Sequence, residues 1–201
     1  MLRRTLLASF ASAASAASAA STSLTPFASF AAEPDAATVK LLRRGGLVLV
    51  MRHALAPGTF DPPEFNVNVC ATQRNLSDEG RAQARRIGQW FTRHQLKPTT
   101  VLSSPWCRCI DTATLAFGRA QAWTALASPV GTASSTNLRS QRELALAVSA
   151  VSKQVGRFEV WVTHQFVIND LAGVATDSGE GVLLRTDANE TVQLAGRIPL
   201  F

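Results

Sequence analysis

Residues 46–53 read Gly-Leu-Val-Leu-Val-Met-Arg-His, an unbroken apolar run that ends abruptly in an arginine and a histidine. A continuous run of branched apolar residues is typical of a strand that is buried on both faces, as in the middle of a parallel sheet. Open α/β sheets bind their ligands at the carboxyl ends of such strands. Arg52 offers a fork of donors that fits phosphate, and His53 can act as a base or nucleophile near neutral pH. The stretch therefore predicts phosphate chemistry at the edge of a central strand.

The composition sets the size of the fold and the kind of partner. The chain has 201 residues, of which 46% are hydrophobic, which suffices for one compact domain and is short for two. The formal charge of +6 would suit a nucleic-acid-binding protein, but the basic residues are scattered and tyrosine is absent. We therefore expect no nucleic-acid partner, and we interpret the charge as attracting anionic substrates to a cleft. The sequence leaves the oligomeric state open.

Residues 1–31 have the pattern of a signal peptide. Arg3 and Arg4 precede an Ala/Ser-rich tract of modest hydrophobicity, and Ser29-Phe30-Ala31 offers a small-x-small cleavage site. The arginine pair suggests the twin-arginine route, but the usual Phe and Lys after it are missing, so Sec export stays open. A disordered Ala/Ser tail is the alternative. No later segment approaches the roughly 20 apolar residues of a membrane span. We expect an exported, periplasmic protein in which residues 32–201 form a single domain.

Export permits disulfide bonds, and the chain has three cysteines, Cys70, Cys107 and Cys109. The odd number leaves at least one thiol free or bonded between molecules. The C-x-C spacing of the last two is not that of redox or zinc motifs. We expect one disulfide from Cys70 to either Cys107 or Cys109. A reactive Cys107 beside Arg108 is an alternative, although no base-bearing motif surrounds it.

Periodicity along residues 32–201 predicts strands that alternate with helices. The expected helices cover residues 34–44, 77 to about 91, 104–118, 138–154 and 165–172, and the expected strands cover 47–52, 99–103, 121–126, 157–163, 181–185 and 191–194, the last two as an edge hairpin. Such alternation predicts an α/β fold, a three-layer sandwich around a mostly parallel sheet. Residues 54–75 exceed the usual connection length and lack periodicity, so we expect a functional loop over the first strand's end.

Residues that suit phosphate follow three separate strands. The first strand ends in Arg52 and His53, the helix after the second carries Arg108 one turn from its start, and the fourth strand ends in His164. In a parallel sheet these junctions lie at one edge, so the side chains can converge. Helix N-termini at two of the junctions add backbone N–H donors. The sequence therefore predicts a pocket shaped for a phosphoryl group.

Four blocks of the sequence resemble the signatures of the histidine phosphatase (phosphoglycerate mutase-like) superfamily. They are Met51-Arg52-His53; Leu76-Ser77-Asp78-Glu79-Gly80-Arg81-Ala82-Gln83-Ala84; Val101-Leu102-Ser103-Ser104-Pro105 with Arg108 and Thr112-Ala113; and Val162-Thr163-His164. The blocks occur in the family's order and cover most of residues 46–173. The resemblance implies the phosphoglycerate mutase-like α/β/α fold.

The same resemblance implies a mechanism. His53 would be the nucleophile and become a phosphohistidine, which water then hydrolyses. Arg52 and Arg108 would clamp the phosphoryl oxygens, and His164 would donate to the same oxygens. No metal and no cofactor is required. Arg74 is a further candidate, either for binding a substrate anion or for pairing with a nearby acid.

The proton donor is the least marked part of the predicted site. Family members place an acid between the second arginine and the second histidine, or directly after that histidine, where this chain has Gln165; another departure is Ala54 in place of glycine after His53. The candidates for a general acid are Glu143 and Asp61. If neither reaches the leaving group, the enzyme should prefer leaving groups that need little protonation.

The predicted function is a metal-independent phosphatase acting on a phosphoester of a small molecule or a cell-envelope component. Some exported family members act on envelope phosphates such as lipopolysaccharide core heptose phosphate. The alternatives are a catalytically weak phosphate-binding protein of the same fold and a phosphomutase, although the mutases' substrate-loop pattern is not visible.

Overall fold

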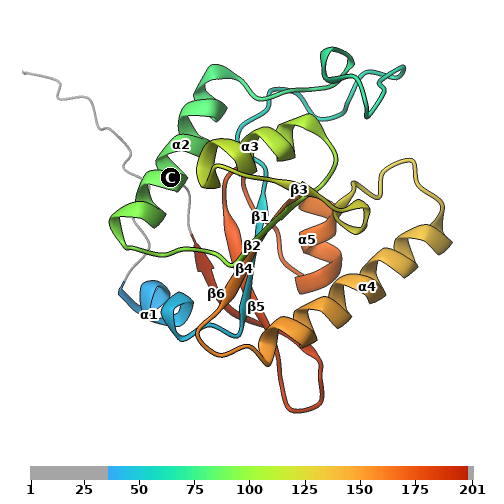
Figure 1. Cartoon of the computed structure of the whole chain (residues 1–201). Helices are drawn as coiled ribbons and strands as arrows, with labels where there is room; N and C mark the ends of the chain where they lie inside the picture. Colours follow the sequence, from blue (N-terminus) through green and yellow to red (C-terminus); the bar gives the residue numbers. More distant parts are fainter. Residues whose placement is uncertain (1–35, 199–201) are drawn as a thin grey trace, which may run out of the picture. The chain divides into compact units, whose positions relative to one another are not determined.

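The computed structural model describes residues 36–198 (Figure 1). The predicted signal peptide, residues 1–31, and the first residues of the predicted domain lie outside the described residues, as do residues 199–201. No helix within residues 36–198 is both long and apolar enough to cross a membrane. Within that range the chain forms α1 (Ala36–Arg44), β1 (Leu47–Arg52), η1 (Cys70–Thr72), α2 (Asp78–Arg93), β2 (Thr100–Ser103), α3 (Cys107–Phe117), β3 (Gln121–Ala122), η2 (Thr124–Leu126), α4 (Ser134–Ser152), β4 (Phe158–Thr163), α5 (Gln165–Ala172), β5 (Gly181–Thr186) and β6 (Val192–Ile198).

The strands form one six-stranded sheet in the order β3-β2-β4-β1-β5-β6. β1 pairs in parallel with β4, β4 with β2, and β2 with β3, whereas β5 is antiparallel to both β1 and β6. The prediction of a mostly parallel sheet with a hairpin at its edge is confirmed. β1 lies inside the sheet with neighbours on both sides, so the strand that carries Arg52 is held by two ladders.

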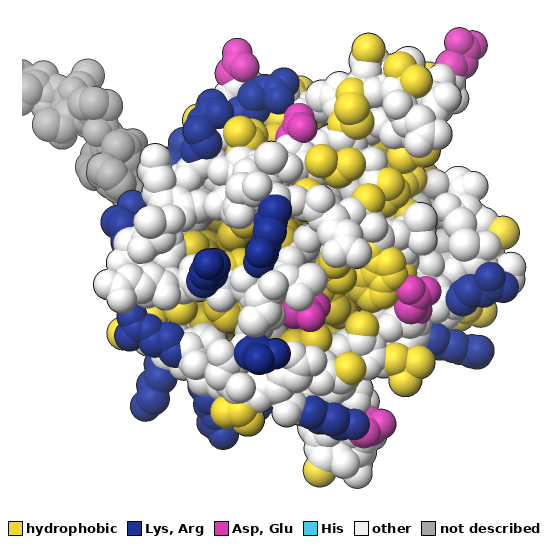
Figure 2. Space-filling model, viewed as in Figure 1, with side chains coloured by type: hydrophobic (Ala, Val, Ile, Leu, Met, Phe, Trp, Pro, Cys, Tyr) yellow, Lys and Arg dark blue, Asp and Glu magenta, His cyan; other side chains and the backbone are white. Residues whose placement is uncertain are grey.

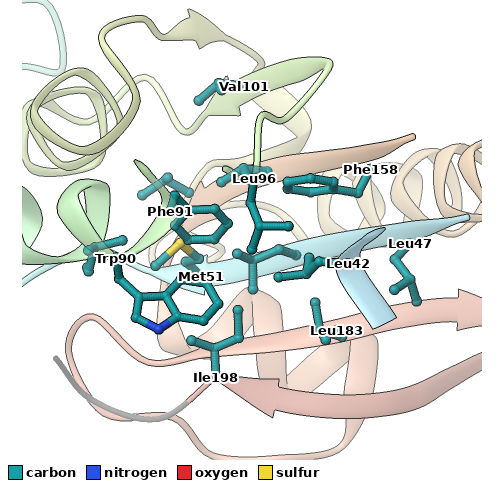
Figure 3. Close-up of a cluster of buried hydrophobic side chains, with 14 of the residues drawn as sticks. Leu42, Leu47, Met51, Trp90, Phe91, Leu96, Val101, Phe158, Leu183 and Ile198 are labelled. Carbon is teal, nitrogen blue, oxygen red and sulfur yellow. The ribbon is translucent and has the colours of Figure 1, made fainter. Parts of the chain in front are cut away.

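Helices cover both faces of this sheet, which explains the unbroken apolar run of β1. Leu47, Leu49 and Met51 point to the face covered by α1, α2 and α3. Val48 and Val50 point to the face covered by α4 and α5. Figure 3 shows the first cluster, in which Met51 lies among side chains that include Trp90 and Phe91 of α2. Each fully buried side chain of this kind contributes about 1.5–3 kcal/mol to folding. The predicted three-layer arrangement is confirmed.

Hydrogen bonds at its start hold the loop of residues 54–75 against the domain. The N–H of Leu55 donates to Gln83 Oε1 (3.0 Å), and the carbonyl of Leu55 accepts the N–H of Ser77 (3.1 Å). Gly80 allows this approach, because a Cβ there would collide with the Leu55 carbonyl. Ser77 caps α2 as predicted, since its side chain accepts the N–H of Gly80 at 3.1 Å. The first turn of α2 therefore holds the beginning of the loop.

Four predicted boundaries are wrong, among them the start of α4, which begins at Ser134 rather than at residue 138, and the end of β6, which extends to Ile198 rather than to residue 194. The third strand spans only Gln121–Ala122, because it pairs with β2 on one side and the chain then turns so that Ala125 and Leu126 pack under α4. The helix expected from residue 104 begins at Cys107, with Trp106 at its N-cap position; the hydroxyl of Ser104 lies 2.8 Å from His164 Nε2 and also accepts the N–H of Trp106 at 3.4 Å.

Charged side chains are dispersed over the part of the surface that Figure 2 shows. Lysine and arginine side chains alternate there with acidic and apolar ones and form no continuous basic band. This face agrees with the scattered basic residues of the sequence.

Candidate active site

Residues from the three predicted junctions line one cavity of about 440 Å³. Arg52 is aligned with Thr163 across the β1–β4 ladder, and the N–H of His53 donates to the Thr163 carbonyl at 3.0 Å. The rings of His53 and His164 consequently lie 5.7 Å apart, edge to face. Arg108, in the first turn of α3, reaches the same cavity. The structure thus brings together the four residues to which the resemblance gave the chemistry.

The tautomer of His53 follows from its hydrogen bond. Its Nδ1 lies 2.7 Å from the carbonyl oxygen of Ala54, which can only accept, so Nδ1 carries the proton and Nε2 the lone pair. Burial above all, with the charges of Arg108, Arg74 and Arg52, lowers the pKa of His53 to about 3, although the bond to Ala54 acts in the opposite direction. His53 is therefore neutral near pH 7, with Nε2 able to act as a nucleophile.

His164 is held in the opposite tautomer. Its Nδ1 lies 3.4 Å from Arg108 Nη2, which can only donate, so Nε2 carries the proton and donates it to Ser104 Oγ at 2.8 Å. Burial, followed by the charge of Arg108, lowers the pKa of His164 well below its ordinary value. Because a hydroxyl can also donate, Ser104 can support the other tautomer once Arg108 turns to a bound anion. Nδ1 of His164 then becomes a donor.

Ser104→Ala is expected to lower kcat about 10- to 100-fold and to change KM little, because the buried Nε2–H of His164 loses its partner. Steady-state kinetics measure this. Ser103→Ala is the matched control, since Ser103 is equally buried but donates to the Ser104 carbonyl at 2.8 Å rather than to a histidine. Ser104→Thr should restore much of the activity. Equal losses in the two alanine variants would contradict a role through His164.

Arg108 is paired with Asp61 across the cavity. Nη1 and Nη2 donate to the two oxygens of Asp61 at 2.8 and 3.2 Å, and Nη1 also donates to the Arg74 carbonyl at 3.2 Å. The Asp61 carboxylate also accepts the N–H of Arg74 (2.9 Å) and Trp106 Nε1–H (3.0 Å). Burial alone would raise the pKa of Asp61, but these hydrogen bonds and the Arg108 charge outweigh it and hold the pKa below its usual value. Asp61 is therefore ionised and carries no proton to donate.

Arg52 and Arg74 complete a positively charged cavity. Arg52 Nη1 donates to the Thr176 carbonyl at 3.0 Å, and Arg74 Nη1 donates to the Ala56 carbonyl at 2.6 Å. Burial lowers the pKa of both guanidinium groups, and the charge of Arg108 adds to that effect. The Nε atoms of Arg52, Arg74 and Arg108 are all buried without a hydrogen-bond partner. Three guanidinium groups against one carboxylate make a site for an anion.

The two predicted general-acid candidates lie in different places. Asp61 lines the cavity, whereas Glu143 is exposed on α4, accepts Trp123 Nε1–H at 2.7 Å, and is not among the lining residues. For Arg74, its cavity position favours binding of an anion, and its guanidinium bonds to a carbonyl rather than to an acid.

Two residues that support the site were given no role from the sequence, although Thr112 belongs to one of the four blocks. Thr112 Oγ1 accepts the N–H of Ala54 (3.0 Å) and donates to the Arg108 carbonyl (2.7 Å), so it joins the nucleophile's segment to α3. Gln73 accepts the N–H of Cys107 at 3.0 Å and holds the loop against the same helix. Thr112 follows Arg108 by one helical turn, and that spacing is the signal that could have identified it.

The disulfide joins Cys70 to Cys107, which is one of the two predicted pairings. It connects the loop of residues 54–75 to the start of α3, next to Arg108. The alternative of a thiol enzyme is not supported, because Cys107 is bonded and burial raises the pKa of the free Cys109 to about 12.

The lowered histidine pKa values predict acid sensitivity. An unfolded histidine has a pKa of about 6.5, so between that value and about 3 the unfolded state binds the proton that folded His53 excludes. The free energy of unfolding should fall as the pH drops below 6.5, by up to about 1.4 kcal/mol per pH unit for each buried histidine. Denaturant unfolding at pH 7, 6 and 5 measures the slope. His53→Asn should flatten it, and an unchanged slope in that variant would contradict the assignment.

Comparisons with known proteins agree with this geometry. The model of the histidine phosphatase superfamily (branch 1) matches residues 48–128. No curated protein matches the chain. Among solved structures, protein histidine phosphatase SixA complexed with tungstate is 15% identical, with 76% of this chain and 96% of that chain covered and a TM-score of 0.53. A mycobacterial glucosyl-3-phosphoglycerate phosphatase with VO3 is 15% identical (74% and 95% covered, TM-score 0.53). A phosphoserine phosphatase from Entamoeba histolytica is 13% identical (76% and 96% covered, TM-score 0.54). At these identities the likeness concerns the fold.

Proposed function

We propose that the chain, whose residues 48–128 match the model of the histidine phosphatase superfamily, is a metal-independent phosphatase that forms a phosphohistidine on His53. The observation that carries the proposal is the state of His53: a neutral imidazole whose Nδ1–H is held by the Ala54 carbonyl, in a cavity with three guanidinium groups. The nucleophile and the anion site lie in the same 440 Å³ cavity. A solvated histidine on the surface would offer neither feature.

In the first step the phosphoryl oxygens are held by Arg52, Arg108 and Arg74. Nε2 of His53 attacks phosphorus in line with the ester oxygen, which leaves with the bonding electron pair. The ring becomes positively charged as the N–P bond forms, and the Nδ1–H bond to the Ala54 carbonyl stabilises that charge. Arg108 must turn from Asp61 toward the phosphoryl group during this step.

In the second step water attacks the phosphohistidine, phosphate leaves, and His53 returns to its neutral state. The charge on the equatorial oxygens is again offset by the guanidinium groups. His164 contributes through Nδ1, which becomes a donor when Ser104 supplies the hydrogen bond to Nε2. Ser104 is thus a positioning residue for His164.

Trapping the intermediate tests the proposal. The protein is mixed with a ³²P-labelled aryl phosphate and quenched, and we expect a label that is stable to alkali, labile to acid and located on the peptide that contains His53. His53→Asn should give no label. Phosphate binding with neither label nor phosphate release would favour the alternative of a phosphate-binding protein. Transfer of the label to a second hydroxyl of the substrate would favour a mutase.

The physiological substrate that we propose is a phosphoester of a small molecule or a cell-envelope component, met outside the cytoplasm. The Cys70–Cys107 bond supports export, because such bonds persist in oxidising compartments. N-terminal sequencing of protein from a periplasmic fraction should find cleavage near residue 31. Export that stops when Arg3 and Arg4 are both changed to lysine would point to the twin-arginine route.

A further inference from the structure

The mouth of the cavity is apolar, although its base is charged. Five large apolar residues line it, here called the apolar rim: Phe60, Phe65, Trp106, Val130 and Phe166. Phe60 is 64% exposed, Val130 51% and Phe166 47%. Exposed large side chains that gather at one opening mark a ligand or partner site, whereas isolated ones need no explanation. The phosphoryl group occupies the base, so the group next to the rim is the ester's leaving group.

The rim is held in a fixed position relative to the nucleophile. Trp106 packs against Phe65 with ring centroids 5.8 Å apart and against His164 at 5.4 Å. Its indole N–H donates to Asp61 at 3.0 Å. The disulfide ties the loop that carries Phe60 and Phe65 to the start of α3. A flat ring entering the cavity would therefore meet aromatic faces and edges, which favour aromatic partners by about 0.5–1.5 kcal/mol per pair beyond area burial.

The positions of the charged residues in the cavity restrict the chemistry of the leaving group. Among the lining residues, the charged side chains are Arg52, Asp61, Arg74 and Arg108, and all of them belong to the phosphoryl end. The rim holds no second cation that would bind a carboxylate or another phosphate. The leaving group that fits is therefore uncharged and apolar.

The protonation states of the groups that line the cavity restrict the leaving group further. Asp61 is the one acid among the lining residues, and the hydrogen bonds that it accepts from the Arg74 N–H and Trp106 Nε1–H still favour its ionised form when Arg108 turns to the phosphoryl group. Without a proton donor the ester oxygen must leave as an anion. A phenol has a pKa of about 10, whereas the pKa of an aliphatic alcohol is close to that of water, about 15.7. A phenolate therefore leaves far more readily than an alkoxide.

We propose that the substrate class is the phosphate monoester of an aromatic hydroxyl group, with its ring on the apolar rim. This inference rests on the proposed function and specifies the substrate of that same site. The Nε2–P bond of His53 forms as the P–O(aryl) bond breaks, and the phenolate keeps the electron pair and takes a proton from solvent. Water then adds to phosphorus as the N–P bond breaks, which releases phosphate and neutral His53.

The first experiment compares phenyl, cyclohexyl and ethyl phosphate as substrates of the wild-type protein, with phosphohistidine trapping in parallel. Phenyl and cyclohexyl phosphate are similar in size, so their KM values should be within a few-fold of each other, and kcat should be at least about 100-fold higher for phenyl. Among substituted phenyl phosphates, kcat should fall at least roughly tenfold from 4-nitrophenyl to phenyl, as expected without a general acid.

The second experiment tests the rim. Phe166→Ala and Phe60→Ala should each raise KM for phenyl phosphate about 5- to 10-fold while the inhibition constant of inorganic phosphate stays the same. Leu146→Ala is the matched control, because Leu146 is 70% exposed on α4 and is not among the lining residues.

The outcomes separate the two levels of the proposal. Phosphohistidine formation with equal kcat for ethyl and phenyl phosphate would overturn the aryl assignment and leave the proposed function intact. Unchanged KM in both phenylalanine variants would overturn the role of the rim. No phosphohistidine with any ester would overturn both.

Discussion

His53→Ala is expected to lower kcat/KM for phosphate release by a factor on the order of 10⁴ or more, because covalent catalysis loses its nucleophile. No other side chain that lines the cavity can replace it. His164 is also neutral, but its Nε2 donates to Ser104 and its Nδ1 accepts from Arg108. Cys109 is buried with a pKa raised to about 12. Phosphate release from phenyl phosphate, followed at saturating and limiting substrate, gives the measurement.

Two controls keep the His53 result interpretable. His53→Asn retains an amide that can donate to the Ala54 carbonyl, so it should fold as the wild type does and still lack activity. His94→Ala removes the third histidine, which packs on Trp90 and is not among the lining residues, and it should keep full activity. Substantial activity in His53→Asn would mean that another group carries the phosphoryl group.

Arg108→Ala should reduce both activity and stability. The substitution removes a guanidinium that would clamp the phosphoryl oxygens, and we expect kcat/KM to fall about 10³-fold. It also leaves Asp61, whose side chain is 11% exposed, as a carboxylate without its cation. Removing one partner of a buried ion pair typically destabilises a fold by about 3–5 kcal/mol. Denaturant unfolding and steady-state kinetics measure the two effects separately.

A second substitution distinguishes the two consequences of losing Arg108. Arg108→Ala with Asp61→Asn should recover much of the lost stability, because the buried charge is removed and the amide oxygen can still accept from one of the two donors, the Arg74 N–H or Trp106 Nε1–H, and should recover little activity. Arg81→Ala is the surface control: Arg81 pairs with Asp111 at 3.2 Å with both side chains 40% exposed, and its loss should cost at most about 1 kcal/mol. Arg108→Ala with wild-type stability would show that the pair is not stabilising.

The fold and the placement of the catalytic residues could be predicted from the sequence because both depend on strand order and strand ends. The apolar run before Arg52 indicates a central strand, and strand ends in a parallel sheet share one edge. The placement of Arg52, His53 and His164 could therefore be predicted from the positions of β1 and β4 alone. The sandwich followed from the alternation of strands and helices.

The remaining features depend on contacts between distant residues. Ser104-Pro105 has the local pattern of a helix start, but the helix begins at Cys107, and the Ser104 hydroxyl also bonds to His164, 60 residues away. Asp61 was predicted as a candidate general acid, but its ion pair with Arg108, 47 residues away, favours the ionised carboxylate. Glu143 lies between the second arginine and the second histidine, as the family's acid does, yet α4 places it outside the cavity lining.

The disulfide partner of Cys70 could also be identified only from the three-dimensional structure. Cys107 and Cys109 are two residues apart on one helix, so they point in different directions. Cys107 faces the loop, whereas Cys109 lies against β4, with Sγ 3.6 Å from the Thr163 carbonyl. Sequence spacing alone could not distinguish them.

The Cys70–Cys107 bond determines when the entropy of ordering the loop is lost. It closes a segment of 37 residues, which in the chain-entropy view restricts the unfolded state by about 3–4 kcal/mol. Phe60, Asp61 and Phe65 lie before Cys70, outside that segment, but the bond fixes the end of their loop to the start of α3 once the protein has folded and oxidised. A substrate then meets a preorganised surface, so its binding free energy is not reduced by loop ordering. Calorimetry of phosphate binding should accordingly show no large entropic penalty.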